Sequence, residues 1–325
     1  MPQTRNQKPH RALLGRTAAR GARQIRGDRR ERLRARRGIH LGDHELFPTH
    51  HGPDAREQGH PRYRRIGAAV TFEHADTHCH LDQFDDPRAA AAEAARARTA
   101  LLAVTTTPQD YLVARELLGD CANVRVGAGL HPWWLADGRS GEDGILALES
   151  LIPTTRFIGE IGLDFMEKHA PVGSWKLQEA AFRRICASAG SASAPDAPKV
   201  LSIHAVRSTE TVLGILRETD CLETCICILH WFSDSADLLW DAIHAGCWFS
   251  LGERSLRTGK GREYLKLIPR DRLLFETDMP WPGDAVLGFA AIAGSLDHAE
   301  RTAVAIIGED AVRQAHENAA GILFL

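Results

Sequence analysis

Residues 74–82 have the sequence His-Ala-Asp-Thr-His-Cys-His-Leu-Asp, which places two histidines directly after a short strand candidate, residues 74–77. Side chains alternate along an extended segment, so His78 and His80 point to the same face of it. Two imidazoles on one face can hold one metal ion together. The stretch therefore predicts a metal-binding pair at the end of a strand.

The same layout recurs along the chain, with helical segments between the strand candidates. The further strand candidates are residues 101–106, 124–128, 156–159, 199–203, 225–229, 247–250 and 272–275. The helical segments include residues 87–98, 111–118, 175–189, 209–218, 235–245 and 261–268. Alternation of this kind favours parallel βαβ units. Eight strands in about 250 residues predict an α/β fold of the (β/α)8 TIM-barrel type rather than an open sheet.

Polar residues stand where these strand candidates end. Besides His78 and His80 they are His131, Glu160, His204, His230 and Asp278, which follow or end the third, fourth, fifth, sixth and eighth candidates. The C-terminal ends of barrel strands form the catalytic face, so residues from several strands converge there. Any one of them alone is more often a structural residue; together they predict a metal site.

The arrangement suits two divalent metal ions. His78 and His80 would hold one ion with Asp278, and His204 and His230 would hold a second. Glu160 comes from a strand between these sets and can bridge both ions. Mixed imidazole and carboxylate ligands suit Mg²⁺, Mn²⁺ or Zn²⁺. Two such ions activate water for an in-line displacement at phosphorus, and Asp278 is the expected general base.

Substrate contacts are predicted at the rim of the barrel, each with an alternative. His131 either faces substrate or forms a tight turn in Gly-Leu-His-Pro. Trp133 and Trp231 stand beside site residues, as do Trp134 and Trp281, and either stack on unpaired bases or wall the barrel mouth. Three basic residues after the seventh strand candidate either contact phosphates or belong to a solvated loop: Arg254, Arg257 and Lys260.

The first seventy residues differ from the rest in charge. Residues 1–70 carry 16 arginines and one lysine against six acidic residues, a net charge of +11, whereas the remainder carries 23 basic and 36 acidic residues, a net charge of −13. So few large apolar side chains favour a disordered extension. It is either a nucleic-acid-binding arm, a transit peptide or a translated stretch upstream of the true start. We therefore predict an extension over 1–70 and a barrel domain over 71–325.

Composition sets the remaining expectations. No apolar run approaches the roughly 18–20 residues of a membrane span, so no membrane partner is expected. The seven cysteines are odd in number and scattered, which favours reduced thiols in a cytoplasmic protein. Cys221, Cys225 and Cys227 lie close together, and core packing is favoured over a zinc site. Residues 188–198, rich in Ser, Ala and Pro, predict a surface loop.

Six motifs contain predicted site residues: DTHCHLD (76–82), GLHPWW (129–134), GEIGLD (159–164), SIHA (202–205), LHWFS (229–233) and ETDMPW (276–281). In order and spacing they resemble the TatD family of metal-dependent hydrolases, within the amidohydrolase superfamily. The likeness covers residues 73–325. Stretches such as VTTTP (104–108) and GCWFSLG (246–252) look most like the TatD-like nuclease of the Qat anti-phage defence system.

The resemblance implies a (β/α)8 barrel, two divalent ions, and 3′–5′ exonuclease or phosphodiesterase activity on DNA. By position, His78, His80 and Asp278 match the ligands of the first ion, and Asp278 also matches the proposed base. His204 and His230 match the ligands of the second ion, and Glu160 matches the shared carboxylate. DNA, as single strands or 3′ ends, and other Qat-type defence proteins are the implied partners.

One departure from the family pattern keeps other functions open. Members usually have His-Ser-Arg where this chain has His204-Ala205-Val206, so a basic residue expected near substrate phosphate is missing. Arg207 is a candidate to replace it. The same metal site would also serve a deacylase or other carbonyl hydrolase. A third alternative is a DNA-end-binding subunit of a defence complex.

Overall fold

The computed structural model describes residues 72–281 and 288–324, which belong to one compact unit of the chain, Pro61–Leu325. Residues 1–70 lie outside the described residues. The predicted division of the chain at residue 70 therefore stays a prediction.

Eight parallel strands form the barrel, as the sequence predicts. Their bounds are β1 His74–Cys79, β2 Thr99–Val104, β3 Val124–Gly127, β4 Phe157–Asp164, β5 Val200–Val206, β6 Ile226–His230, β7 Trp248–Leu251 and β8 Leu273–Phe275. Hydrogen bonds join them in chain order within two sheets, β1-β2-β3 and β4 to β8. A bridge between Ala128 and Ile158 connects the sheets on one side, and the backbone N–H of Asp278 donates to the carbonyl of His78 on the other. The barrel is thereby closed.

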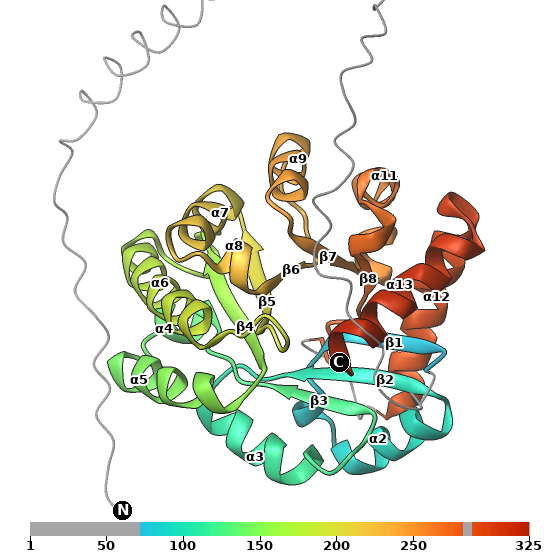
Figure 1. Ribbon diagram of the computed structural model, residues 1–325, viewed down its shortest axis with the longest axis horizontal. Coiled ribbons are helices and arrows are strands. Elements are labelled where there is room, and N and C mark those ends of the chain that lie inside the picture. Colours follow the sequence, from blue (N-terminus) through green and yellow to red (C-terminus); the bar gives the residue numbers. More distant parts are fainter. Residues whose placement is uncertain (1–71, 282–287, 325) are drawn as a thin grey trace, which may run out of the picture. The chain divides into compact units, whose positions relative to one another are not determined.

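Helices surround the strands, and Figure 1 shows them outside the barrel. They are α2 Pro87–Arg96, α3 Pro108–Leu118, α4 Pro132–Ala136, α5 Glu142–Leu151, α6 Trp175–Ala192, α7 Thr209–Glu218, α8 Cys221–Thr224, α9 Ala236–His244, α10 Glu253–Leu256, α11 Gly259–Leu267, α12 Phe289–Ile307 and α13 Glu309–Leu323. Short 3-10 turns lie at Leu81–Gln83, Ile152–Thr154, Val172–Ser174 and Arg270–Arg272.

Alternating side chains of the strands fill two separate apolar cores. Along β2, Leu101 and Ala103 pack in the core that the helices cover, whereas Leu102 and Val104 belong to a second, smaller cluster. That second cluster also contains Ile322 and Leu323 of α13. Because neighbouring strand residues point to opposite sides, the smaller cluster is the barrel interior, and the end of α13 packs into it.

Three strands extend at least two residues further than expected. β1 runs to Cys79, β4 to Asp164 and β5 to Val206, so His78, Glu160 and His204 lie within strands rather than at or after their ends. Their polar side chains interrupt the apolar pattern by which strand ends are predicted. The expected surface loop at 188–198 is also wrong in its first part. α6 continues to Ala192, because Ala and Ser tolerate a helix, and Pro195 lies just beyond its end.

Candidate metal centre

Glu160 lies at the centre of the predicted site. Its carboxylate is almost fully buried, and its Oε1 accepts hydrogen bonds from His204 Nδ1 and His230 Nε2, both at 2.8 Å. Its Oε2 lies 3.4 Å from His80 Nε2 and 3.8 Å from His78 Nε2. One carboxylate therefore touches both predicted histidine pairs, each through a different oxygen.

Asp278 completes the cluster from the opposite side. Its Oδ1 lies 3.5 Å from His78 Nε2 and 3.4 Å from His80 Nε2. The residue follows β8 with a left-handed backbone (φ 55°), and its N–H bonds to His78 of the neighbouring strand. A left-handed non-glycine residue carries a backbone cost, so the fold holds Asp278 in place against its preference. All six predicted ligands thus meet at one end of the barrel.

Hydrogen bonds to the Nδ1 atoms orient the imidazoles of His78 and His80. His78 Nδ1 pairs with Ser202 Oγ at 2.7 Å, and His80 Nδ1 donates to the carbonyl of Val104 at 3.1 Å. With Nδ1 engaged, Nε2 of each ring is directed toward the carboxylates. Metal-binding histidines in proteins are held in this way, with the second ring nitrogen bonded to a neighbouring group.

These residues fit divalent metal ions. The Nε2 atom of His78 is buried and has no hydrogen-bond partner among the described residues, although it faces Asp278 and Glu160. An orphaned buried nitrogen is costly unless another group satisfies it. Donor atoms 3.4–3.5 Å apart around it match the edges of a coordination shell with metal–ligand bonds of about 2.1 Å.

Charge in the cluster favours bound cations. Burial opposes ionisation of Glu160, yet the surrounding imidazoles, led by His131 and His230, hold its pKa well below the usual range. Burial also opposes a charged His204, but Asp164 and Glu160 raise its pKa to about 9. The carboxylates therefore draw positive charge into a buried site, where divalent ions can supply it.

His131 lies in the cluster as well. Its Nε2 is 3.2 Å from Glu160 Oε1, and its Nδ1 accepts a hydrogen bond from the backbone N–H of Trp133 at the start of α4. His131 therefore forms the turn before α4 and also contacts Glu160, and its contact with substrate stays a prediction. Trp133 turns its indole N–H to Asp164 Oδ2 at 2.6 Å.

The predicted basic residues have unlike positions. Arg207 is exposed, with a left-handed backbone (φ 54°), and lines an open hollow of about 730 Å³ at the C-terminal ends of β4 and β5. Arg254 places its guanidinium 3.4 Å from the ring centre of Trp281 and 5.8 Å from that of Trp231. Arg257 pairs with Glu253, and Lys260 donates to the carbonyl of Ser233. Arg254 lies in α10 and Lys260 in α11, so the alternative of a loop is wrong for these two residues, and the contact with phosphate stays a prediction.

Two carboxylates that the sequence analysis did not single out take part in the site. Asp164 Oδ2 lies 3.3 Å from His204 Nε2 and also bonds to Trp133. Glu276 is buried, accepts a hydrogen bond from Ser250 Oγ, and bonds to the N–H of Trp231 at 2.8 Å. Both residues belong to quoted motifs, GEIGLD and ETDMPW. Asp164 lies four residues after Glu160 and therefore on the same face of β4, which was the available signal.

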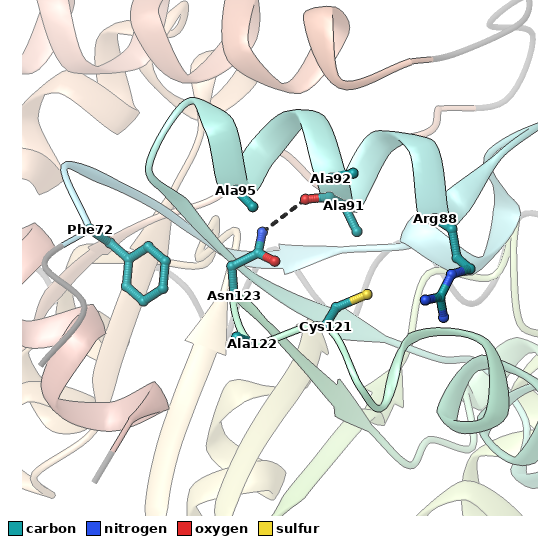
Figure 2. A pocket seen from close by; sticks show the side chains of 8 residues that line it. All are labelled: Phe72, Arg88, Ala91, Ala92, Ala95, Cys121, Ala122 and Asn123. Carbon is teal, nitrogen blue, oxygen red and sulfur yellow. Dashed lines mark hydrogen bonds between the residues drawn. The ribbon is translucent and has the colours of Figure 1, made fainter.

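A separate hollow lacks this chemistry. Figure 2 shows it beside α2, with Asn123 donating to the carbonyl of Ala91 at 3.1 Å. It is lined by Phe72, Arg88, Ala91, Ala92, Ala95, Cys121, Ala122 and Asn123. Arg88 pairs with Asp120, and burial raises the pKa of the Cys121 thiol. Its lining offers neither a metal-binding set nor an activated nucleophile.

Cys221, Cys225 and Cys227 were weighed as a zinc site against core packing. Among the described residues, no cysteine belongs to a group of side chains that could hold a metal ion.

Residues 75–315 match the family model of TatD-related DNases. The chain belongs to this family. The TatD-related relatives include an uncharacterized metal-dependent hydrolase, YcfH, of Escherichia coli K12, which is 31% identical over 63% of this chain and 77% of its own length. The deoxyribonuclease TATDN3 of Homo sapiens is 26% identical over 38% of this chain and 42% of its own.

Among solved structures, the TatD homologue YJJV of Escherichia coli K12 has a TM-score of 0.65 at 20% identity, over 79% of this chain and 99% of its own. That likeness confirms the fold. Family membership makes this TatD-related protein a metal-dependent hydrolase, with the cluster around Glu160 as its candidate metal centre. In the described part of the chain, no helix is long and apolar enough to cross a membrane.

Proposed function

We propose that the protein is a divalent-metal-dependent deoxyribonuclease, a phosphodiesterase of the 3′–5′ exonuclease type that acts on single-stranded DNA or on 3′ ends. The observation that carries the proposal is the position of Glu160 between two histidine pairs, which provides for two ions sharing one carboxylate. Many phosphodiester-cleaving enzymes use two metal ions that lie close together in this way.

The residues of the candidate metal centre have separate roles in the proposed reaction. Two bound ions of Mg²⁺, Mn²⁺ or Zn²⁺ would polarise the phosphoryl group and lower the pKa of water. His78, His80 and Asp278 would hold one ion, His204 and His230 the other, and Glu160 both. Asp278 is the general base, because its side chain is 19% exposed against 4% for Glu160 and so meets incoming water and substrate.

Arg254 is the proposed phosphate contact. Its guanidinium has no hydrogen-bond acceptor or ion-pair partner among residues 72–281 and 288–324, and it rests on the indole of Trp281. Trp281 follows Asp278 by three residues, and Trp231 follows His230, so the group lies at the mouth of the metal centre. A guanidinium with free N–H donors can bind one phosphate group through two parallel hydrogen bonds.

The hollow beside Arg207 is suited to a nucleotide. Phe165 and Trp175 stack there with ring centres 4.7 Å apart, next to Lys168 and Arg207. Aromatic rings stack on unpaired bases, and the two cations offer charge to the backbone of a strand. The hollow opens at the barrel end where Asp164 touches His204. A strand end could therefore reach from the ions into this hollow.

We further propose a cytoplasmic role in anti-phage defence, with DNA and other Qat-type proteins as partners. This part rests on the motif resemblance and on the seven free cysteines of the chain. Reconstituting the defence system in cells tests it. A variant carrying Asp278→Asn should lose protection against phage if cleavage matters. Protection that persists with a nuclease-dead variant would favour a DNA-end-binding subunit instead.

The second candidate activity is hydrolysis of a carbonyl substrate, such as an ester. The observation in its favour is Ala205 and Val206, which replace the family's usual Ser-Arg beside His204. Incubating Mn²⁺-loaded protein with 5′-labelled single-stranded DNA and, separately, with aryl esters distinguishes the two. Stepwise shortening from the 3′ end supports the nuclease, whereas ester cleavage with intact DNA overturns it.

A further inference from the structure

A second cluster of metal-binding side chains lies away from the candidate metal centre. His74 begins β1, Glu300 belongs to α12 and His316 to α13, and one donor atom from each lies within 4.8 Å of the other two. His74 precedes His78 by four residues, about 13 Å along an extended strand. The cluster is therefore distinct from the site around Glu160.

The geometry brings both imidazoles onto one carboxylate. His74 Nδ1 lies 2.9 Å from Glu300 Oε2 and 3.1 Å from Oε1, and His316 Nε2 lies 3.3 Å from Oε1. The two rings meet edge to face, with centres 5.5 Å apart. The two nitrogens thus lie 2.9–3.3 Å from the carboxylate, and all three donor atoms lie within 4.8 Å of one another, which is close enough for one ion to bind all three.

One nitrogen of the cluster lacks a satisfied hydrogen bond. His316 Nε2 is buried and lies 3.3 Å from Glu300 Oε1, and it makes no hydrogen bond of normal geometry in the described part of the chain. The ring itself is fixed by contact with Phe275, at 5.7 Å between ring centres. A buried ring nitrogen aimed at a carboxylate but not bonded to it is the arrangement that an ion would complete.

The cluster also carries the right charge and access. Burial would raise the pKa of Glu300, but the imidazoles of His316 and His74 outweigh it and hold the pKa at about 2. The carboxylate is therefore ionised under all ordinary conditions. The His74 side chain is 44% exposed, against 12% for Glu300 and 11% for His316. An ion can thus enter past His74 and keep a water as its fourth ligand.

We propose that His74, Glu300 and His316 form a zinc site that fastens the first strand of the barrel to its last two helices. Two imidazoles and a carboxylate are a common ligand set for Zn²⁺. The three ligands come from both ends of the described chain, so the ion would tie together segments more than 200 residues apart. Its role is structural and does not depend on the substrate of the other site.

The test compares zinc content in three single variants of the full chain. His74→Gln and His316→Gln each remove one ligand, and His298→Gln is the control, an exposed histidine on the same helix as Glu300. Each protein is stripped with EDTA, reloaded with Zn²⁺ and passed through a desalting column, and zinc per chain is measured by elemental analysis. The series is repeated with His204→Asn and His230→Asn present, which reduces binding at the other site.

His74→Gln and His316→Gln should each bind one zinc ion fewer than the control in both backgrounds. Zinc at about 100 times its Kd should raise the Tm of the control by roughly 5 °C more than that of His316→Gln. Because His74 is half exposed, its variant is expected to fold even if His316→Gln does not. Equal zinc content in all three variants, or a loss that appears only with the His204 and His230 changes, would overturn the proposal.

Discussion

At the scale of single residues, the site depends on carboxylates that the barrel holds among imidazoles. Glu160 touches all four predicted histidine ligands, whereas Asp278 touches only His78 and His80. Replacing the shared residue therefore disturbs both ion positions at once. Replacing a ligand of one position leaves the other pair intact.

Glu160→Gln is expected to lower kcat for DNA cleavage on the order of 100-fold or more, because even groups that only support metal ligands cost 10- to 100-fold when removed. Metal content of the purified variant should fall in parallel. Glu263→Gln, at an exposed glutamate on α11, is the control and should leave both quantities unchanged. A Glu160→Gln variant with normal metal content and normal cleavage would contradict the assignment of Glu160.

Arg254→Met should lower kcat/KM on single-stranded DNA roughly 10- to 100-fold, mainly through KM, because a charged hydrogen bond to phosphate contributes about 1.5–3 kcal/mol. Arg257→Met is the matched control, since Arg257 lies on the same segment but pairs with Glu253. Steady-state kinetics over a range of DNA concentrations measures both. Equal effects of the two substitutions would argue against a specific phosphate contact.

At the scale of elements, residue spacing identified which strands carry the site but not how far they extend. His78, His80 and the later strand ends were found because polar residues stopped apolar runs. Asp164 and Glu276 were missed because each lies in a motif whose function was already assigned to another carboxylate, Glu160 in GEIGLD and Asp278 in ETDMPW. The contact of His131 with Glu160 depends on the turn before α4, which a single sequence does not specify.

The close approach of β4 and β5 supports the site. Gly162 has a left-handed backbone (φ 141°), and a Cβ at this position would collide with the carbonyl oxygen of His204 on β5. Gly162→Ala should destabilise the protein by about 2–4 kcal/mol through strain and overpacking. Gly214→Ala is the control, because nothing lies within 4 Å of its Cβ in α7, and it should stabilise by about 0.5–1 kcal/mol. Urea unfolding measures both, and similar effects would contradict this packing.

Acid stability should depend on the contact between β1 and α12. In EDTA-treated protein, the pKa of Glu300 is about 2 against an ordinary value of 4.5, because the imidazoles of His316 and His74 outweigh burial. A lowered carboxyl pKa gives stability that is present above about pH 4.5 and lost as the pH falls toward 2. Wild type should therefore exceed Glu300→Gln at pH 6 and approach it near pH 2. Urea midpoints across this range test it, and a gap independent of pH would refute it.

At the scale of the whole molecule, the barrel could be predicted because eight short apolar segments alternate with helical segments along the chain. The closing elements were harder to predict. α12 and α13 were not expected, although α13 places Ile322 and Leu323 in the barrel interior. Their contribution depends on contacts across the whole chain rather than on local pattern. The net charge of +11 in residues 1–70 and of −13 in the remainder, by contrast, is a property of the sequence alone.

The central claim is that the cluster around Glu160 cleaves DNA with bound divalent ions. It is tested most directly by incubating EDTA-stripped protein with 5′-labelled single-stranded DNA and adding back Mg²⁺, Mn²⁺ or Zn²⁺, for wild type and for Asp278→Asn. We predict that the wild type shortens the DNA from its 3′ end only after an ion is restored, and that Asp278→Asn does so at least about 100-fold more slowly. Metal-loaded wild-type protein that leaves the DNA intact, or cleavage that is equal in the two proteins, would contradict the account.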